Sequence, residues 1–208
     1  MARFVSVSVA AVVVAAAVVA VLVGHAPSIA DVTTDATGTT SGVVVRDAMA
    51  ADLPAMAAIY DEQVHTSVAT FDTQARGAAY LGDKLVHRGG GDIIVVAEQA
   101  GEVLGYASSG PFRPRAAYAG TKEVSVYLSN GARGRGVGRQ LYAALLARLD
   151  AEPSVHTQLA VIALPNEASE ALHRAFGFER VGVLREVGHK FGRYVDTAWW
   201  QRLPSLEP

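Results

Sequence analysis

A short loop rich in glycine and arginine most constrains what this chain can fold into. It lies between an apolar strand-like segment and an apolar-periodic helix, and it reads Arg133-Gly134-Arg135-Gly136-Val137-Gly138-Arg139. Glycines let backbone N–H groups approach a phosphate without a Cβ in between, and a helix N-terminus carries a partial positive charge. Because three arginines add full charges, the loop predicts the binding of a di-anion such as a pyrophosphate.

Other phosphate-binding loops differ from this one in sequence and in place. A dinucleotide fingerprint follows the first strand and precedes an acidic residue by about 20 positions. Here the loop follows the fourth predicted strand, and Asp150 comes 12 residues after Gly138. The chain contains neither the Gly-Lys-Ser/Thr of a P-loop nor the Gly-x-Ser-x-Gly of an α/β-hydrolase. Both of those classes are therefore excluded.

Composition divides the chain into an apolar segment (1–30), a linker rich in Thr, Gly and Asp (31–42) and a globular domain (43–208). Residues 4–24 are apolar over a length that suits a membrane anchor, because a spanning helix needs about 20 residues. Residues 28–30, Ser-Ile-Ala, also have the form of a signal-peptide cleavage site. A third alternative is that translation begins near Val43.

Charge and residue usage narrow the function further. The net charge is −2, so the chain lacks the basic surface expected of a nucleic-acid-binding protein. The absence of cysteine excludes disulfides, thiolate metal sites and a cysteine nucleophile. The 6 histidines are scattered without a carboxylate at ligand spacing, and we therefore expect no metal site.

Hydrophobic periodicity in residues 43–208 predicts the element order β α α β β β α β α β β. This order is typical of an α/β (α+β) domain with a mixed central sheet and helices on both faces. Strands are expected at 43–46, 93–98, 103–108, 123–128, 159–163, 178–187 and 193–202. Helices are expected at about 52–64, 74–88, 137–150 and 166–176.

The loop resembles the acetyl-CoA loop of the GCN5-related N-acetyltransferases (GNAT), which reads Arg/Gln-x-x-Gly-x-Gly/Ala. Arg133, Gly136 and Gly138 match it residue for residue. Residues 105–108, 123–128, 160–166 and 188–193 are most similar to the phosphinothricin and methionine sulfoximine N-acetyltransferase subfamily. The resemblance covers 43–208 and implies the acyl-CoA N-acyltransferase fold with acetyl-CoA as co-substrate. It also implies acetylation of the amino group of a small amino-acid-like substrate, by direct attack on the thioester.

The resemblance implies a set of cofactor-binding residues. The thioester oxygen is expected to be held by backbone N–H groups of Val126, Tyr127 and Leu128, because the fourth and fifth strands splay apart in this family. Asn166 matches an asparagine that contacts the cofactor, and it also suits the N-cap of the following helix. The full set is Val126, Tyr127, Leu128, Arg133, Gly134, Arg135, Gly136, Val137, Gly138, Arg139 and Asn166.

Two residues have expected catalytic roles. Glu123 matches the general base of the subfamily, which is needed because an amine is mostly ammonium at neutral pH. The alternative is an ordinary surface charge that pairs with Lys122. His173 stands where the broad family has a tyrosine acid, and it would protonate the leaving thiolate or order water. The alternative for His173 is a structural histidine.

An amino-acid substrate requires a cation for its carboxylate. Arg113 and Arg115 lie in a loop where the subfamily builds part of its substrate site, and Tyr118 would pack over the substrate. Phe71 would form a second wall. Lys190 would line the site too, or that of a neighbouring subunit, since relatives form dimers. The alternative for the arginine loop is a solvated turn.

Two other functions stay open. One is a GNAT enzyme that acts on another amine, such as a peptide N-terminus, and the other is a non-catalytic acyl-CoA-binding domain attached to the membrane. The resemblance implies a cytoplasmic homodimer with a role in antibiotic or herbicide resistance. Because acetyl-CoA is cytosolic and a membrane span would place the domain outside, we expect translation to begin near Val43.

Overall fold

The computed structural model describes residues 42–203 except residue 87. The predicted apolar segment, its cleavage site and all but the last residue of the linker lie outside the described residues. Within the described part, strands and α-helices follow in the predicted order. They are β1 (Val44–Asp47), α1 (Leu53–Thr66), α2 (Gly77–Val86), β2 (Ile94–Gln99), β3 (Glu102–Pro111), β4 (Thr121–Leu128), α3 (Val137–Asp150), β5 (Thr157–Ala163), α4 (Glu167–Ala175), β6 (Glu179–Lys190) and β7 (Arg193–Arg202).

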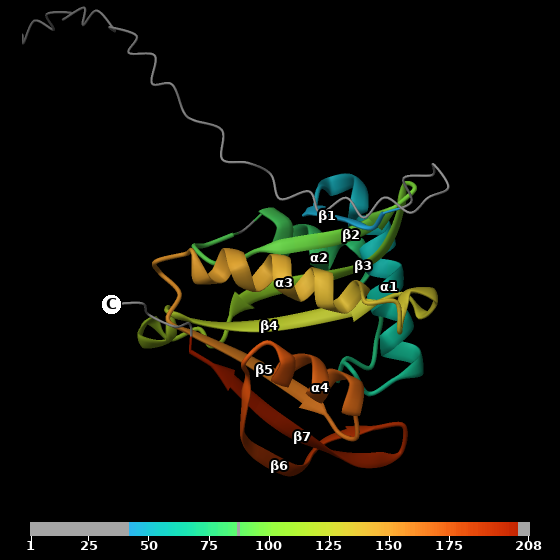
Figure 1. Cartoon of the computed structure of the whole chain (residues 1–208). Coiled ribbons are helices and arrows are strands. Elements are labelled where there is room, and N and C mark those ends of the chain that lie inside the picture. The colour runs from blue at the N-terminus through green and yellow to red at the C-terminus, as the bar shows by residue number, and fades with distance from the viewer. Residues whose placement is uncertain (1–41, 87, 204–208) are drawn as a thin grey trace, which may run out of the picture. The chain divides into compact units, whose positions relative to one another are not determined.

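The strands form one 7-stranded sheet in the order β1-β2-β3-β4-β5-β7-β6. Its pairs are antiparallel except for β4 and β5, which run parallel, so the predicted mixed sheet is confirmed. The β4–β5 pairing covers only the positions from Thr121–Thr157 to Glu123–Leu159, although β4 continues to Leu128. Figure 1 shows the two strands diverging beyond this short pairing.

Helices cover both faces of the sheet because side chains along each strand alternate between the faces. In β2, Val95 and Ala97 belong to the core under α3, whereas Ile94 and Val96 belong to the core under α1 and α2. The strand is therefore apolar on both faces, as expected of a central strand with helices on each side. No helix among the described residues has both the length and the apolar character that crossing a membrane requires.

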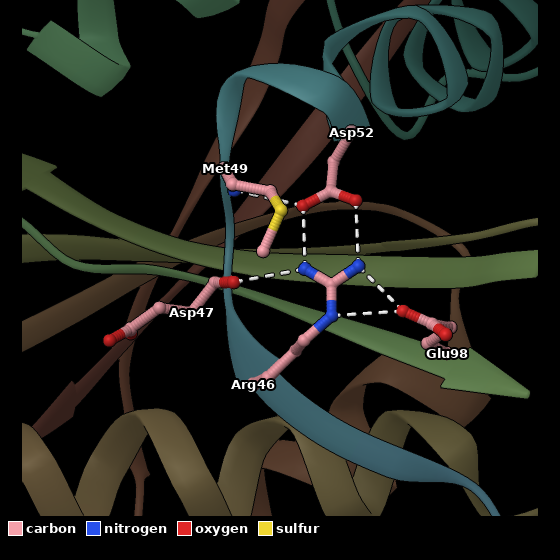
Figure 2. A network of polar contacts seen from close by, with 5 residues as sticks. All are labelled: Arg46, Asp47, Met49, Asp52 and Glu98. Atoms are coloured by element: carbon pink, nitrogen blue, oxygen red, sulfur yellow. Dashed lines mark hydrogen bonds and ion pairs between the residues drawn. The ribbon is translucent and has the colours of Figure 1, made fainter. Parts of the chain in front are cut away.

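An arginine in β1 joins the start of the domain to β2 (Figure 2). Arg46 donates to both carboxylate oxygens of Asp52, at 2.7 and 2.8 Å, and to Glu98 at 2.6 and 2.9 Å. Asp52 also accepts from the backbone N–H of Met49 at 2.8 Å. The Arg46 hydrogen bonds hold the pKa of Asp52 below its usual range, although burial of this carboxyl acts in the opposite direction.

Replacing Arg46 by methionine is expected to lower the free energy of unfolding at pH 7 by about 2 kcal/mol, because Asp52 stays buried without its cation. The pKa of Asp52 is lower in the folded state than in the unfolded chain. Its stabilising contribution is therefore present at neutral pH and is lost as the pH falls below about 4. Urea unfolding at pH 7 and pH 3 should show a difference between wild type and variant that shrinks in acid. A constant difference would contradict this account, and Arg46→Lys is the control that keeps the charge.

Candidate active site

The hydrogen bonds between β3 and β4 determine which backbone groups of β4 are free. In an antiparallel pair, successive residues direct their N–H and C=O groups alternately toward and away from the partner strand. The N–H of Ser129 donates to Leu104 at 2.9 Å, and the N–H of Phe112 donates to Thr121 at 3.4 Å. The odd-numbered residues of β4 therefore direct their backbone groups toward β3, and the even-numbered ones toward β5.

The free edge of β4 consists of the even-numbered residues beyond the short pairing with β5. Val126 and Leu128 lie on this edge, so their N–H groups are available to a ligand, as expected. Tyr127 is a correction, because it is opposite Tyr106 and directs its N–H toward β3. Tyr127 nevertheless lines the space beside the strand. The expected strand splay is thus present, with two of the three expected donors facing it.

The glycine loop places several backbone N–H groups at the N-terminus of α3. Gly134 and Gly136 have left-handed φ angles of 74° and 79°, and a Cβ at either position would meet no heavy atom within 4 Å. The first bond of the helix is donated by the N–H of Arg139 to Gly136 at 3.1 Å. In the described part of the chain, the N–H groups of 134–138 have no hydrogen-bond partner. Such a cluster at a helix N-terminus fits a pyrophosphate.

The three arginines of the loop have different surroundings. Arg133 donates to the side-chain oxygen of Gln63 at 2.9 Å, and Arg135 donates to that of Gln99 at 2.6 Å. The Arg139 guanidinium lies 5.5 Å from the centre of the Phe176 ring. Of the three, only Arg133 lines the large cavity beside the loop.

This cavity, which we call the donor cavity, has a volume of about 390 Å³. It extends from the glycine loop along the free edge of β4 to the start of α4. Asn166 lines it and also caps α4, because its side-chain oxygen accepts from the N–H of Ser169 at 3.1 Å. The predicted N-cap is thus confirmed. Val137 is fully buried in the core, so only its backbone faces the loop.

A second cavity, the acceptor cavity, lies on the other side of the splay and has a volume of about 300 Å³. A narrow passage of about 80 Å³ lies between the two cavities and shares wall residues with both, Tyr127 among them. The acceptor cavity combines aromatic rings with one cation and one carboxylate. These side chains are Tyr60, Phe71, Tyr80, Lys84, Tyr106, Glu123 and Tyr127.

Glu123 is the carboxylate of the acceptor cavity. Its side chain reaches solvent through the cavity, and it has no ion pair with a described residue. Burial by the surrounding protein raises its pKa, while the nearby charges of Lys84 and Arg113 act in the opposite direction. Lys122 does not pair with it, because the Lys122 ammonium lies 2.6 Å from Asp92. The fold thus leaves a carboxylate without an ion pair to a described residue, and with a raised pKa, in the wall of the acceptor cavity.

The surroundings of His173 favour the structural alternative over a general acid. The side chain is 3% exposed. Its Nδ1–H donates to the carbonyl oxygen of Ser169 at 2.7 Å, and Nε2 accepts from the Tyr142 hydroxyl at 2.7 Å. Burial lowers its pKa, which favours the neutral imidazole. Both ring nitrogens are therefore occupied, and the contacts support the structural alternative.

The expected substrate residues divide into one that lines the acceptor cavity and four that do not. Phe71 lines the cavity. Lys190 does not line the acceptor cavity of its own chain: it is buried, donates to the carbonyl oxygen of Thr70 at 2.7 Å, and lines a different cavity of about 280 Å³. Its ammonium thus holds the chain after α1 in place.

The loop with Arg113, Arg115 and Tyr118 lies outside the acceptor cavity. Phe112 anchors this loop, because its ring lies 6.1 Å from Trp199 and 5.5 Å from Tyr118. The Arg113 guanidinium lies 4.9 Å from the centre of the same Phe112 ring. All three expected residues are exposed, as in the solvated alternative, and of them only Arg113 acts on the pKa of Glu123.

The missed residues of the acceptor cavity come from α1, α2 and β3, the last of which contributes Tyr106. Tyr60, Tyr80 and Lys84 belong to helices whose spacing indicates core packing, and no local motif distinguishes them. Among the described residues, no group of three or more His, Asp or Glu side chains is placed to hold a metal ion.

The arrangement of the loop, the strand edge and the cavities defines a class of protein. A phosphate-binding loop, a free strand edge and a carboxylate without an ion pair to a described residue lie along neighbouring cavities that share wall residues. They suit an enzyme that transfers a group from a phosphate-bearing donor to an acceptor across the edge of β4.

Comparison with known proteins gives the family. The acetyltransferase (GNAT) domain matches residues 45–199. The chain is 42% identical over 167 residues to phosphinothricin N-acetyltransferase of Streptomyces coelicolor, covering 78% of this chain and 97% of that protein. It is also 42% identical over 168 residues to the L-methionine sulfoximine/L-methionine sulfone acetyltransferase of Pseudomonas aeruginosa, with 79% and 95% covered.

A solved structure agrees with these matches. The phosphinothricin acetyltransferase of Sinorhizobium meliloti, in complex with AcCoA, has a TM-score of 0.74 and 40% identity, covering 78% of this chain and 88% of that one. The chain therefore belongs to the GNAT family and is an acetyltransferase.

Proposed function

We propose that this enzyme transfers the acetyl group of acetyl-CoA to the amino group of a small amino-acid-like acceptor, of the phosphinothricin or methionine sulfoximine type. The observation that carries the proposal is the meeting of the donor and acceptor cavities at the free edge of β4, with Glu123 in the acceptor cavity. The named activities of the relatives from Streptomyces and Pseudomonas support this acceptor class.

Acetyl-CoA supplies an acetyl group that is activated as a thioester. The N–H groups of 134–138 and the Arg133 guanidinium are suited to its pyrophosphate, and Arg135 and Arg139 add positive charge nearby. Asn166 would contact the arm that runs along β4. The N–H groups of Val126 and Leu128 would hold the thioester oxygen.

Glu123 would take a proton from the acceptor ammonium. The neutral nitrogen then attacks the thioester carbon, the C–S bond breaks, and the proton that the nitrogen loses passes through water to the thiolate of coenzyme A. The products are an amide and free coenzyme A. Since a coenzyme A thiolate leaves without a dedicated acid, this scheme gives His173 no proton to transfer; together with Tyr142 it shapes the passage.

Lys84 is the cation best placed for the carboxylate of an amino acid. It lines the acceptor cavity with Glu123, its ammonium lies 4.7 Å from the centre of the Tyr80 ring, and it forms no ion pair with a described residue. In an α-amino acid the carboxylate is one carbon away from the amine that Glu123 would deprotonate. The cavity thus offers one charge to each end of such an acceptor.

Replacing Lys84 by methionine, an unbranched side chain that is one atom shorter and carries no charge, is expected to raise KM for methionine sulfoximine about tenfold, because a charged hydrogen bond is lost. The decarboxylated amine of the same compound should show little change. Steady-state kinetics with both acceptors at saturating acetyl-CoA measure this. An equal effect on both acceptors would refute recognition of the carboxylate by Lys84.

We further propose a homodimer that acts in the cytoplasm, where acetyl-CoA is available, with resistance to amine toxins as its consequence. The edge strand β6 supports dimer formation, because Val181, Val183 and Val187 are 57%, 40% and 55% exposed. Such an edge is suited to pairing with another chain. Analytical ultracentrifugation tests this, and a monomer at micromolar concentration would refute it.

The proposed activity is tested by following thiol release from acetyl-CoA with phosphinothricin, methionine sulfoximine, ordinary amino acids and short peptides. Fast turnover of the first two compounds supports the proposal. Turnover of peptides alone would keep the chemistry and replace the acceptor. Binding of acetyl-CoA without any turnover would favour the acyl-CoA-binding alternative.

A further inference from the structure

The acceptor cavity contains a buried phenol that the scheme above does not use. Tyr106, in β3, is 2% exposed and lines this cavity. Within the described part of the chain, its hydroxyl has no hydrogen-bond partner. The Tyr60 hydroxyl, in the same cavity wall, differs because it contacts Thr70 at 2.8 Å and Asp72 at 2.7 Å.

The Tyr106 hydroxyl is open to the cavity. Four described side-chain atoms are both closed off from solvent and without a partner: Gln63 Nε2, Thr197 Oγ1, Trp199 Nε1 and Trp200 Nε1. The Tyr106 oxygen is not one of them, so it borders open space. Burial raises the pKa of this phenol well above its ordinary value, which keeps its proton in place for donation.

A second phenol lies beside the first. The ring centres of Tyr106 and Tyr127 are 5.5 Å apart, and the Tyr127 hydroxyl also has no partner among the described side chains. Burial keeps this phenol protonated as well, by raising its pKa. Next to them, the hydroxyls of Ser108 and Ser125 contact each other at 3.1 Å. The two phenols are therefore the neutral O–H donors of this wall that have no partner among the described residues.

The two charged side chains of the cavity are proposed to bind the amino and carboxylate groups, which all α-amino acids share. Glu123 would take the amine, and Lys84 would take the carboxylate. The hydroxyls of Tyr106 and Tyr127 are then available to bind the acceptor's side chain. A hydroxyl donor binds an oxygen attached to sulfur or phosphorus well, whereas a thioether sulfur is a weak acceptor.

We propose that Tyr106, with Tyr127 beside it, selects acceptors whose side chain carries an oxo group on sulfur or phosphorus. This inference rests on the proposed function and adds the feature of the acceptor that the site distinguishes. A site built to hydrogen-bond a substrate group discriminates against an analogue that lacks it, because its buried polar groups are then left unpaired. The phenols thus favour a sulfone or sulfoximine over the parent thioether.

Methionine sulfone and methionine form the matched acceptor pair, because they differ only in the two oxygens on sulfur. The full-length wild-type enzyme is expected to have the higher kcat/KM with the sulfone. Tyr106→Phe removes one oxygen atom from the protein and should lower kcat/KM for the sulfone about tenfold, with methionine changing less than about twofold. Calorimetric binding of each compound to the enzyme with coenzyme A should show the same selective loss without any turnover.

Several outcomes would overturn the inference. One is a wild-type enzyme with equal kcat/KM for methionine sulfone and methionine. Another is a Tyr106→Phe variant in which kcat/KM falls equally for both compounds, or falls for neither. Tyr60→Phe is the control, because it removes a hydroxyl of the same wall that already bonds Thr70 and Asp72, and it should affect both acceptors alike. If Tyr106→Phe does not fold, Tyr127→Phe tests the same selectivity. A wild-type enzyme that acetylates neither compound overturns the proposed function, and this inference with it.

Discussion

Glu123→Gln is expected to lower kcat/KM for the amine acceptor by about 10²- to 10⁴-fold, the range typical of a lost general base. Glutamine keeps the shape of the side chain but cannot accept the proton of the ammonium. Binding of coenzyme A should stay within about twofold of wild type, because Glu123 lines the acceptor cavity and not the donor cavity. Thiol-release kinetics and calorimetry measure the two quantities separately.

The pH dependence of kcat/KM should differ between the wild-type enzyme and Glu123→Gln. Glu123 acts when ionised, so wild-type kcat/KM should fall as the pH drops through its pKa, which burial raises above the ordinary glutamate value. The acceptor amine adds its own titration at higher pH. The variant should retain only the titration of the amine. Glu102→Gln, at the exposed start of β3, is the control, and an acid limb that persists in Glu123→Gln would rule out Glu123 as the base.

Gly136→Val is expected to weaken coenzyme A binding about 10- to 100-fold. Gly136 is the N-cap of α3 with φ of 79°, a conformation that costs a β-branched residue about 1–3 kcal/mol. The loop can relieve this strain only by changing its backbone conformation, which would move the N–H groups of 134–138. Equilibrium binding of coenzyme A, followed by calorimetry, measures the change.

Gly131→Ala is the matched control for this variant. Gly131 lies in the approach to the same loop, has no positive φ, and would place a Cβ in open space. It should leave coenzyme A binding within about twofold of wild type. Equal weakening by both substitutions would show that the left-handed backbone at Gly136 is not what forms the phosphate site.

The parts of the site that could be predicted are those encoded in a few consecutive residues. The glycine loop and Glu123 lie within one strand-loop-helix unit, and the chemistry of each is visible in its residue type and place. The element order was predictable for the same reason, because the periodicity of a strand or helix is local. The sheet order then brought Glu123 to the edge where β4 and β5 part.

The parts that could not be predicted depend on partners distant in the chain. His173 occupies the position of a family acid, but Tyr142, which binds its Nε2, belongs to α3. Lys190 has the charge expected of a substrate ligand, yet its ammonium donates to the carbonyl oxygen of Thr70, in the segment after α1. Lys84 and Tyr106 were missed as residues of the acceptor cavity, because a lysine on a helix and a tyrosine in a strand are ordinary residues until the fold places them in one cavity.

The short pairing of β4 with β5 has a mechanical consequence. Two half-sheets, β1 to β4 and β5 with β7 and β6, are joined within the sheet only by the pairs between Thr121–Thr157 and Glu123–Leu159. An extended ligand arm along the free edge takes the place of the backbone contacts that a closed sheet would have there. Bound acetyl-CoA would then hold the two half-sheets together along this edge, and each release of coenzyme A would remove that contact.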